Sequence, residues 1–169
     1  MQAQTSQAAR ILGPAEGRQG DLGSIGVRFM LAGAESAGRF SLVEHPMPPR
    51  RLAAPLHRHN REDEYSFVLE GRMGALLGDE VVYAEPGDLV WKPRGQWHTF
   101  WNAGDAPARI LELISPAGFE EFFGELLDAG GVAAAGPEVL GELCERYALD
   151  MDPSSVPGLQ ARFGVTLGG

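Results

Sequence analysis

Turn-forming segments interrupt the first two thirds of the chain at short intervals. The 169 residues include 23 Gly and 12 Pro, and both residue types break regular structure, so this density favours short strands over long helices. We predict nine short strands, at residues 26–31, 38–45, 54–59, 64–69, 73–77, 80–84, 88–92, 97–102 and 109–114. Short strands at such close spacing indicate a mainly β fold, an antiparallel sandwich or barrel.

The hydrophobic pattern changes to a helical period after residue 114. Ser115 is a suitable N-cap, Pro116 suits the first helical position, and Gly130 should end this helix. One stripe of the helix is apolar, formed by Phe119, Phe122, Phe123, Leu126 and Leu127. Pro137 begins a second predicted helix, with Cys144 on its buried side as a core residue.

These two patterns divide the chain at residue 114. We predict a β-barrel at residues 10–114 and a C-terminal helical appendage of the same domain at 115–169. The tail at residues 150–169 has only weak periodicity, so no structure is assigned to it.

The composition excludes several classes of partner and location. The 14 Lys and Arg against 23 Asp and Glu give a net charge of −9, which repels nucleic acid and anionic membrane surfaces. The one cysteine, Cys144, forbids an internal disulfide and a Cys-based zinc site. The first residues lack the apolar stretch of a signal peptide, and no apolar run approaches the ~20 residues of a membrane span. We therefore expect a cytoplasmic protein.

Four residues of metal-ligand type lie in two patterned segments. His57 and His59 are two apart, so a strand presents both imidazoles on one face. Glu64 has the other parity, but the polar turn at residues 60–63 can reset it and let a hairpin aim the carboxylate at the same point. The distant His98 completes three nitrogens and one oxygen. This donor set suits one divalent transition metal, which can be Fe, Mn, Ni, Co, Cu or Zn.

Both segments resemble the two sequence motifs of the cupin family. The second motif has five fixed positions, met here by Gly87, Pro93, Gly95, His98 and Asn102. The first motif is met by His57, His59, Glu64 and Gly71. The family pattern also has a Gly six residues before the first His, where this chain has Arg51.

The resemblance to small single-domain cupins carries expectations for the fold and the site. It implies the cupin double-stranded β-helix, a jelly-roll-like barrel, here followed by two C-terminal α-helices. It also implies that His57, His59, Glu64 and His98 point into the barrel mouth as metal ligands. Gly71, Gly87, Pro93 and Gly95 then serve backbone geometry, and Asn102 ties a turn.

Strand parity also separates residues that face the metal from residues that face away. Trp97 and Trp101 oppose His98, so we expect them to pack against the Phe119 stripe or a second subunit. With exposed sheet edges, this favours a homodimer. Phe100 and Val68 are candidates for the lining of an apolar pocket that fits an organic substrate.

Several other polar residues are interpreted as solvated or structural. Glu62 and Asp63 are expected to be loop charges, and His45, before a proline at a strand end, is expected at the surface. Surface positions are also favoured for three basic residues that could otherwise bind a substrate anion, Arg28, Arg50 and Lys92.

The leading functional hypothesis is a metal-dependent small-molecule enzyme. Resemblance to the quercetinase-like cupins implies a dioxygenase acting on an aromatic or enolisable organic substrate, with Glu64 as a possible general base at the edge of the metal. A non-catalytic metal- or ligand-binding cupin, of sensor or storage type, is one alternative. The other is a metal-dependent isomerase or lyase that needs no oxygen.

Overall fold

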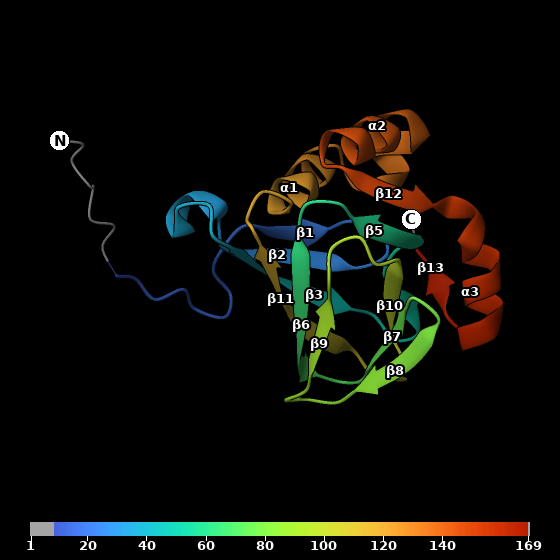
Figure 1. The fold of residues 1–169 in the computed structure, drawn as a ribbon. Helices are drawn as coiled ribbons and strands as arrows, with labels where there is room; N and C mark the ends of the chain where they lie inside the picture. Colours follow the sequence, from blue (N-terminus) through green and yellow to red (C-terminus); the bar gives the residue numbers. More distant parts are fainter. Residues whose placement is uncertain (1–8, 169) are drawn as a thin grey trace.

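Two β-sheets form the walls of a barrel in the computed structural model, which describes residues 9–168 (Figure 1). The six-stranded sheet has the order β1 (Gln19–Asp21), β2 (Gly26–Leu31), β3 (Ser41–Met47), β11 (Ala108–Ser115), β6 (Asp63–Glu70) and β9 (Leu89–Lys92). The seven-stranded sheet has the order β12 (Leu149–Asp152), β5 (Leu56–His59), β10 (His98–Asn102), β4 (Arg51–Leu52) and β13 (Thr166–Leu167), and β10 also pairs with β7 (Met73–Leu77), which pairs with β8 (Glu80–Ala84). Every pair is antiparallel except β13 with β4, which is parallel. The predicted mainly β barrel is confirmed.

Alternation along the strands determines what fills the barrel. In β11 the buried positions are Ala108, Ile110, Glu112 and Ile114, and every residue between them is partly exposed. Because side chains alternate between the two faces of a strand, Glu112 must lie inside with its apolar neighbours. In β6 the buried alternate positions are Glu64, Ser66 and Val68. The barrel interior therefore contains polar side chains on the adjacent strands β6 and β11, among them Glu64 and Glu112.

Three α-helices follow the main run of strands, one more than the sequence predicted. Helix α1 spans Glu120–Asp128, α2 spans Val132–Arg146 and α3 spans Val156–Phe163, with short 3-10 turns at Gly33–Ser36 and Pro153–Ser155. None of the helices in residues 9–168 is long and apolar enough to cross a membrane.

The predicted helix starts need correction. The first helix begins at Glu120 and not at Pro116, because Gly118 has a φ of 135°, outside the helical region. The second begins at Val132, earlier than predicted, but its backbone is broken at Gly136, where φ is 73° and ψ is 172°. A proline disfavours the helical conformation of the residue before it, so Pro137 starts the second part of α2.

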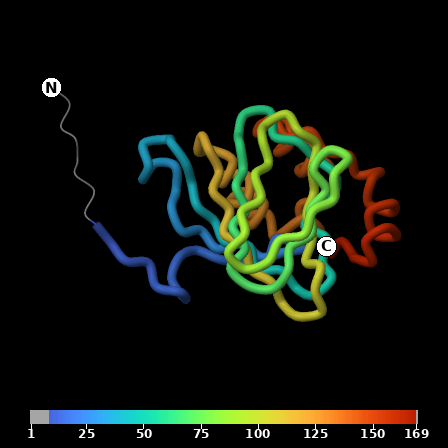
Figure 2. Tube along the Cα trace, turned by 60° about the horizontal axis from the view of Figure 1, so that its bottom comes forward, coloured from blue at the N-terminus to red at the C-terminus, as the bar shows by residue number. Residues whose placement is uncertain are grey.

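The tail that the sequence left unassigned is part of the barrel wall. Strand β12 pairs with β5, placing Leu149 opposite His59 and Met151 opposite His57. Strand β13 pairs with β4, so Arg51 lies in a strand, opposite Thr166. Figure 2 shows the C-terminal segment in red along one side of the barrel. Part of the predicted helical appendage thus contributes strands to the second sheet, beside the strand that carries two histidines.

Trp101 joins this tail to the barrel, which corrects the predicted partner of its indole ring. It faces away from His98 as parity predicted, but it is 1% exposed and stacks on Phe163 of α3, with ring centroids 4.0 Å apart. It therefore contacts neither the Phe119 stripe nor a second subunit. Trp97 is half-buried, beneath the guanidinium of Arg58 at 5.0 Å.

Candidate metal centre

The fold brings the four predicted ligands to one point inside the barrel. Strand β5 supplies His57 and His59, β6 supplies Glu64 and β10 supplies His98. One ligand atom from each residue lies within 4.8 Å of the others, and all four side chains are buried. Glu64 Oε1 is 3.3 Å from His59 Nε2, and Glu64 Oε2 is 3.4 Å from His98 Nε2. These residues could hold a divalent metal ion.

Glu64 does not reach the histidines through a hairpin, as the sequence predicted, but from the other sheet. Strand β5 belongs to the seven-stranded sheet and β6 to the six-stranded sheet, so the two strands do not pair. The carboxylate therefore approaches the histidines from the opposite wall of the barrel. On the histidine side, His98 lies directly opposite His57 in the β5–β10 pair. Gly95, at a φ of 78°, donates its N–H to His59 O at 2.7 Å, which ties the loop before His98 to β5.

Backbone contacts orient two of the imidazoles. His57 Nδ1 is 2.8 Å from Pro55 O, and His98 Nδ1 is 3.0 Å from Gln96 O. A carbonyl oxygen only accepts, so each Nδ1 must donate its proton, and each Nε2 keeps a lone pair. A hydrogen bond of this kind on the other ring nitrogen is the usual support of a metal-ligating histidine.

Unpartnered nitrogens show that the site fits a metal ion. Within residues 9–168, His98 Nε2 and both ring nitrogens of His59 are buried without a hydrogen-bond partner. A buried polar atom left unpaired costs about 1–3 kcal/mol, and coordination to a cation would satisfy such nitrogens. Three imidazoles and one carboxylate are the donors that divalent transition metals accept.

Burial sets the protonation of these groups. It lowers the pKa of the His57 imidazole, and the neighbouring His98 and His59 lower it further. Burial also lowers the pKa of His98. For Glu64, burial alone would raise the pKa, but the charges of His59 and Lys92 outweigh it and hold the pKa well below its ordinary value. His57 and His98 are thus neutral imidazoles and Glu64 is an anionic carboxylate, the forms that bind metal.

A buried lysine stands behind the carboxylate, where the sequence predicted a surface residue. Lys92 Nζ lies 3.0 Å from Glu64 Oε2 and 2.5 Å from Glu112 Oε1. Ser66 Oγ donates to Glu112 Oε2 at 2.6 Å. Burial raises the pKa of Glu112 to about 7, against the lowering effect of Lys92. Strand parity could have found this network, because Lys92 shares the inner face of β9 with buried Val90.

For other polar residues, some sequence predictions are correct and others are wrong. Arg28 and Glu62 are buried, contrary to expectation: Arg28 Nη2 pairs with Glu44 Oε2 at 2.7 Å, and Glu62 Oε2 lies 4.0 Å from His59 Nδ1. Arg50 is exposed as predicted and pairs with Asp105. Asn102 holds a turn as predicted, because its Nδ2 donates to three backbone carbonyls, those of Met47, Pro48 and Ala106.

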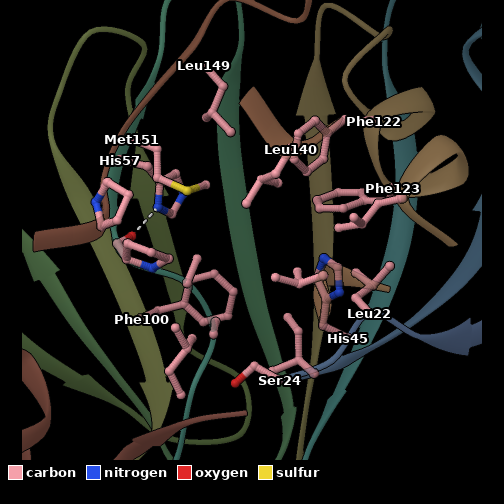
Figure 3. Close-up of a pocket in the computed structure, with 18 of the residues that line it drawn as sticks. Leu22, Ser24, His45, His57, Phe100, Phe122, Phe123, Leu140, Leu149 and Met151 are labelled. Carbon is pink, nitrogen blue, oxygen red and sulfur yellow. Dashed lines mark hydrogen bonds between the residues drawn. The ribbon is translucent and has the colours of Figure 1, made fainter. Parts of the chain in front are cut away.

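An apolar cavity of about 500 Å³ opens beside the cluster (Figure 3). His57, His59 and Glu64 form part of its wall, and Phe119 packs edge-on against the His59 ring at 4.3 Å. Helices and tail supply most of the remaining wall, including Phe122, Phe123, Leu126, Val132, Leu140, Leu149, Met151, Val156 and Pro157. Phe100 lines the cavity as predicted, whereas Val68 lies in the barrel core. His45, predicted at the surface, is 2% exposed and also lines the cavity.

Similarity to known proteins agrees with this architecture. Residues 44–114 match the family model described as a cupin domain. Over 60 residues the chain is 35% identical to the tetracenomycin polyketide synthase protein TcmJ of Streptomyces glaucescens, a stretch that covers 36% of this chain and 40% of TcmJ. The chain spans less than half the length of the curated relatives it matches.

Solved structures share the fold. The polyketide cyclase RemF of Streptomyces resistomycificus is 25% identical, with a TM-score of 0.54 over 64% of this chain and 80% of that chain. KdgF of Halomonas sp. is 17% identical, with a TM-score of 0.59 over 68% of this chain and 99% of that chain. The family match over the motif-bearing strands, together with this shared barrel, identifies residues 44–114 as a cupin domain.

Proposed function

We propose that this cupin is a metal-dependent enzyme that acts on an aromatic or enolisable organic substrate. One observation carries the proposal: the cluster of three histidines and Glu64 opens onto an apolar cavity of about 500 Å³. A cavity of this size accommodates a drug-sized ring system, and most of its lining is apolar, with the metal-ligand residues His57, His59 and Glu64 on one side. Such a combination favours chemistry on the oxygen atoms of a largely apolar molecule.

His57, His59, His98 and Glu64 would hold one divalent ion of Fe, Mn, Ni, Co, Cu or Zn. A bound ion would supply Lewis acidity that makes a nearby C–H or O–H group more acidic. The chain's own contribution is orientation. Lys92 holds Glu64 Oε2, which also lies beside His98, and Oε1 lies beside His59 without a contact to Lys92.

The comparisons favour a reaction without oxygen as the first candidate. TcmJ is described as a polyketide synthase protein and RemF as a polyketide cyclase. In a cyclisation, Glu64 takes a proton from a carbon next to a carbonyl group, and that carbon then bonds to a second carbonyl carbon of the same substrate. The proton on Glu64 passes to the oxygen of the attacked carbonyl. Atoms and electrons balance without an oxidant.

The donor set favours a second candidate, a quercetinase-like dioxygenase. Three imidazoles and one glutamate are the ligands that the resemblance to these cupins implies. Here Glu64 would again act as the base that deprotonates the substrate hydroxyl.

Turnover with and without oxygen separates these candidates. Purified protein of known metal content is given flavonol, catechol, 1,2-dione and 1,3-diketone substrates in sealed cells, with an oxygen electrode and product chromatography. Product formed under nitrogen supports the cyclase class, and oxygen consumed in step with substrate supports the dioxygenase.

Two variants control this assay. His98→Ala should lose turnover, whereas Trp91→Ala, at an exposed position away from the cavity, should keep it. Binding of these compounds without turnover under either gas would overturn the enzyme proposal in favour of the sensor or storage alternative.

A further inference from the structure

A fourth histidine faces the cavity and takes no part in the metal cluster. His45 lies on β3, where it shares the inner face with buried Val43 and Met47. It is 2% exposed and lines the same cavity as His57. Figure 3 shows the two rings on opposite sides of the pocket, with Phe100 on the side of His57.

The proton of His45 is located by its backbone contact. Nδ1 lies 2.8 Å from Gly26 O, and since a carbonyl oxygen only accepts, Nδ1 donates. The other nitrogen, Nε2, then carries a lone pair. Among residues 9–168, no side chain or backbone group forms a hydrogen bond with Nε2. The cavity thus contains an acceptor without a donor from the protein.

The surroundings keep this imidazole neutral. Phe123 packs edge-on against it with ring centroids 5.0 Å apart. Burial lowers the pKa of His45 to about 4, although the Gly26 carbonyl and the charges of Glu64 and Glu44 act in the opposite direction and Lys92 adds to the lowering. A neutral imidazole whose proton is committed to Gly26 can accept a hydrogen bond from a ligand but cannot attract an anion.

We infer that His45 Nε2 accepts a hydrogen bond from a neutral hydroxyl group of the cavity's ligand, and so selects a hydroxylated aromatic compound over its ether or deoxy analogue. This inference rests on the proposed function for the other end of the ligand, which faces the metal cluster. A ligand without the hydroxyl group would cover this acceptor and leave it unpaired, which is costly, so such a ligand binds less well. His45 is a binding residue here and takes no part in bond making.

Two naphthalenes test this selection without requiring turnover. The as-purified protein is titrated by calorimetry with 2-naphthol, which has one hydroxyl donor, and with 2-methoxynaphthalene, which has none. We expect 2-naphthol to bind about tenfold more tightly, the ratio that about 1.4 kcal/mol of hydrogen bonding produces.

Two substitutions at the same position connect this ratio with His45. In His45→Phe a phenyl ring replaces the imidazole and the nitrogen acceptor is lost, so the ratio of the two affinities should fall to about one. In His45→Gln the amide nitrogen can donate to Gly26 O while the amide oxygen accepts from the ligand, so the preference should return. Thermal melting followed by circular dichroism establishes that each variant is folded.

The outcomes separate this inference from the proposed function. An equal affinity for both naphthalenes, no binding of either, or a preference that survives in His45→Phe overturns the role of His45. A preference that disappears in His45→Phe and returns in His45→Gln supports it, even if the protein proves to turn over no substrate. Failure of the metal chemistry would leave the naphthol preference in place.

Discussion

The ammonium group of Lys92 lies 3.0 Å from Glu64 Oε2, inside the barrel and out of contact with solvent. On its other side it contacts Glu112, so one buried cation joins two buried carboxylates. Burying a lone charge is costly, and a paired charge lowers that cost only while its partner is present. Lys92 therefore keeps Glu64 anionic and fixed in orientation on the side facing the histidines.

Loss of the lysine charge should destabilise the fold strongly. In Lys92→Met, Glu64 and Glu112 remain buried without their shared cation, so we expect the free energy of unfolding to fall by about 3–5 kcal/mol. Urea denaturation measures this. As a matched control, Arg50→Met removes an exposed cation from its pair with Asp105 and should change nothing measurable.

The double variant Lys92→Met/Glu112→Gln distinguishes a charge effect from a packing effect. Removing one of the two stranded carboxylates should restore part of the lost stability. A double variant that is less stable than Lys92→Met alone would contradict the assigned role.

Stability should depend on pH through His45. Its pKa falls from an ordinary 6.5 to about 4 in the folded protein because of burial. Between these two pH values His45 binds a proton in the unfolded chain but not in the folded chain. The free energy of unfolding therefore decreases as pH falls from 6.5 to about 4, and it levels off below. The full difference is about 3 kcal/mol. His45→Gln should remove this part of the pH dependence, measured by urea denaturation at pH 7, 5.5 and 4, and identical slopes in both proteins would contradict it.

The aromatic stack between barrel and tail should be a major source of stability. Trp101→Ala removes the ring that packs on Phe163, and a buried Trp replaced by Ala costs about 3–5 kcal/mol. The segment from residue 156 should also become sensitive to limited proteolysis. Trp91, 56% exposed, provides the control, because Trp91→Ala should change stability by less than about 0.5 kcal/mol. Equal effects at the two positions would show that the stack contributes little.

The part of the fold that depends on local pattern could be predicted from the sequence. Strands at 73–77 and 80–84 were predicted at their observed bounds, because alternating side chains and turn residues define them locally. Strands β1 and β12 were missed, since Gln19–Asp21 and Leu149–Asp152 are short and extended only through pairing with β2 and β5. Tertiary pairing of this kind leaves no periodic signal in a short segment.

The candidate site could be predicted for its ligands but not for its surroundings. Fixed motif spacing located His57, His59, Glu64 and His98. Lys92 was missed because an isolated lysine is usually solvated, and the partner that makes its burial possible, Glu112, lies on a strand twenty residues away. Helices and tail supply most of the cavity wall beyond the ligands, and their packing over the barrel has no counterpart in a local pattern.

The predicted homodimer remains open to a direct measurement of mass. Trp101 does not contribute to a subunit contact, since it is buried within the chain, but Phe67 and Leu89 are exposed opposite each other on strands β6 and β9. Size-exclusion chromatography with light scattering should return twice the chain mass of 18.1 kDa. A mass equal to one chain at micromolar concentration would refute the homodimer.

Elemental analysis shows whether His57, His59, Glu64 and His98 bind one divalent metal ion. Protein purified without chelator, and the same protein after dialysis against each candidate ion, is compared with His59→Ala, His98→Ala and the control His45→Gln. We predict about one ion per chain in the wild type and the control, and less than about a tenth of that in the two ligand variants. Metal content near zero in the wild type after dialysis, or equal content in His98→Ala, would refute this metal site.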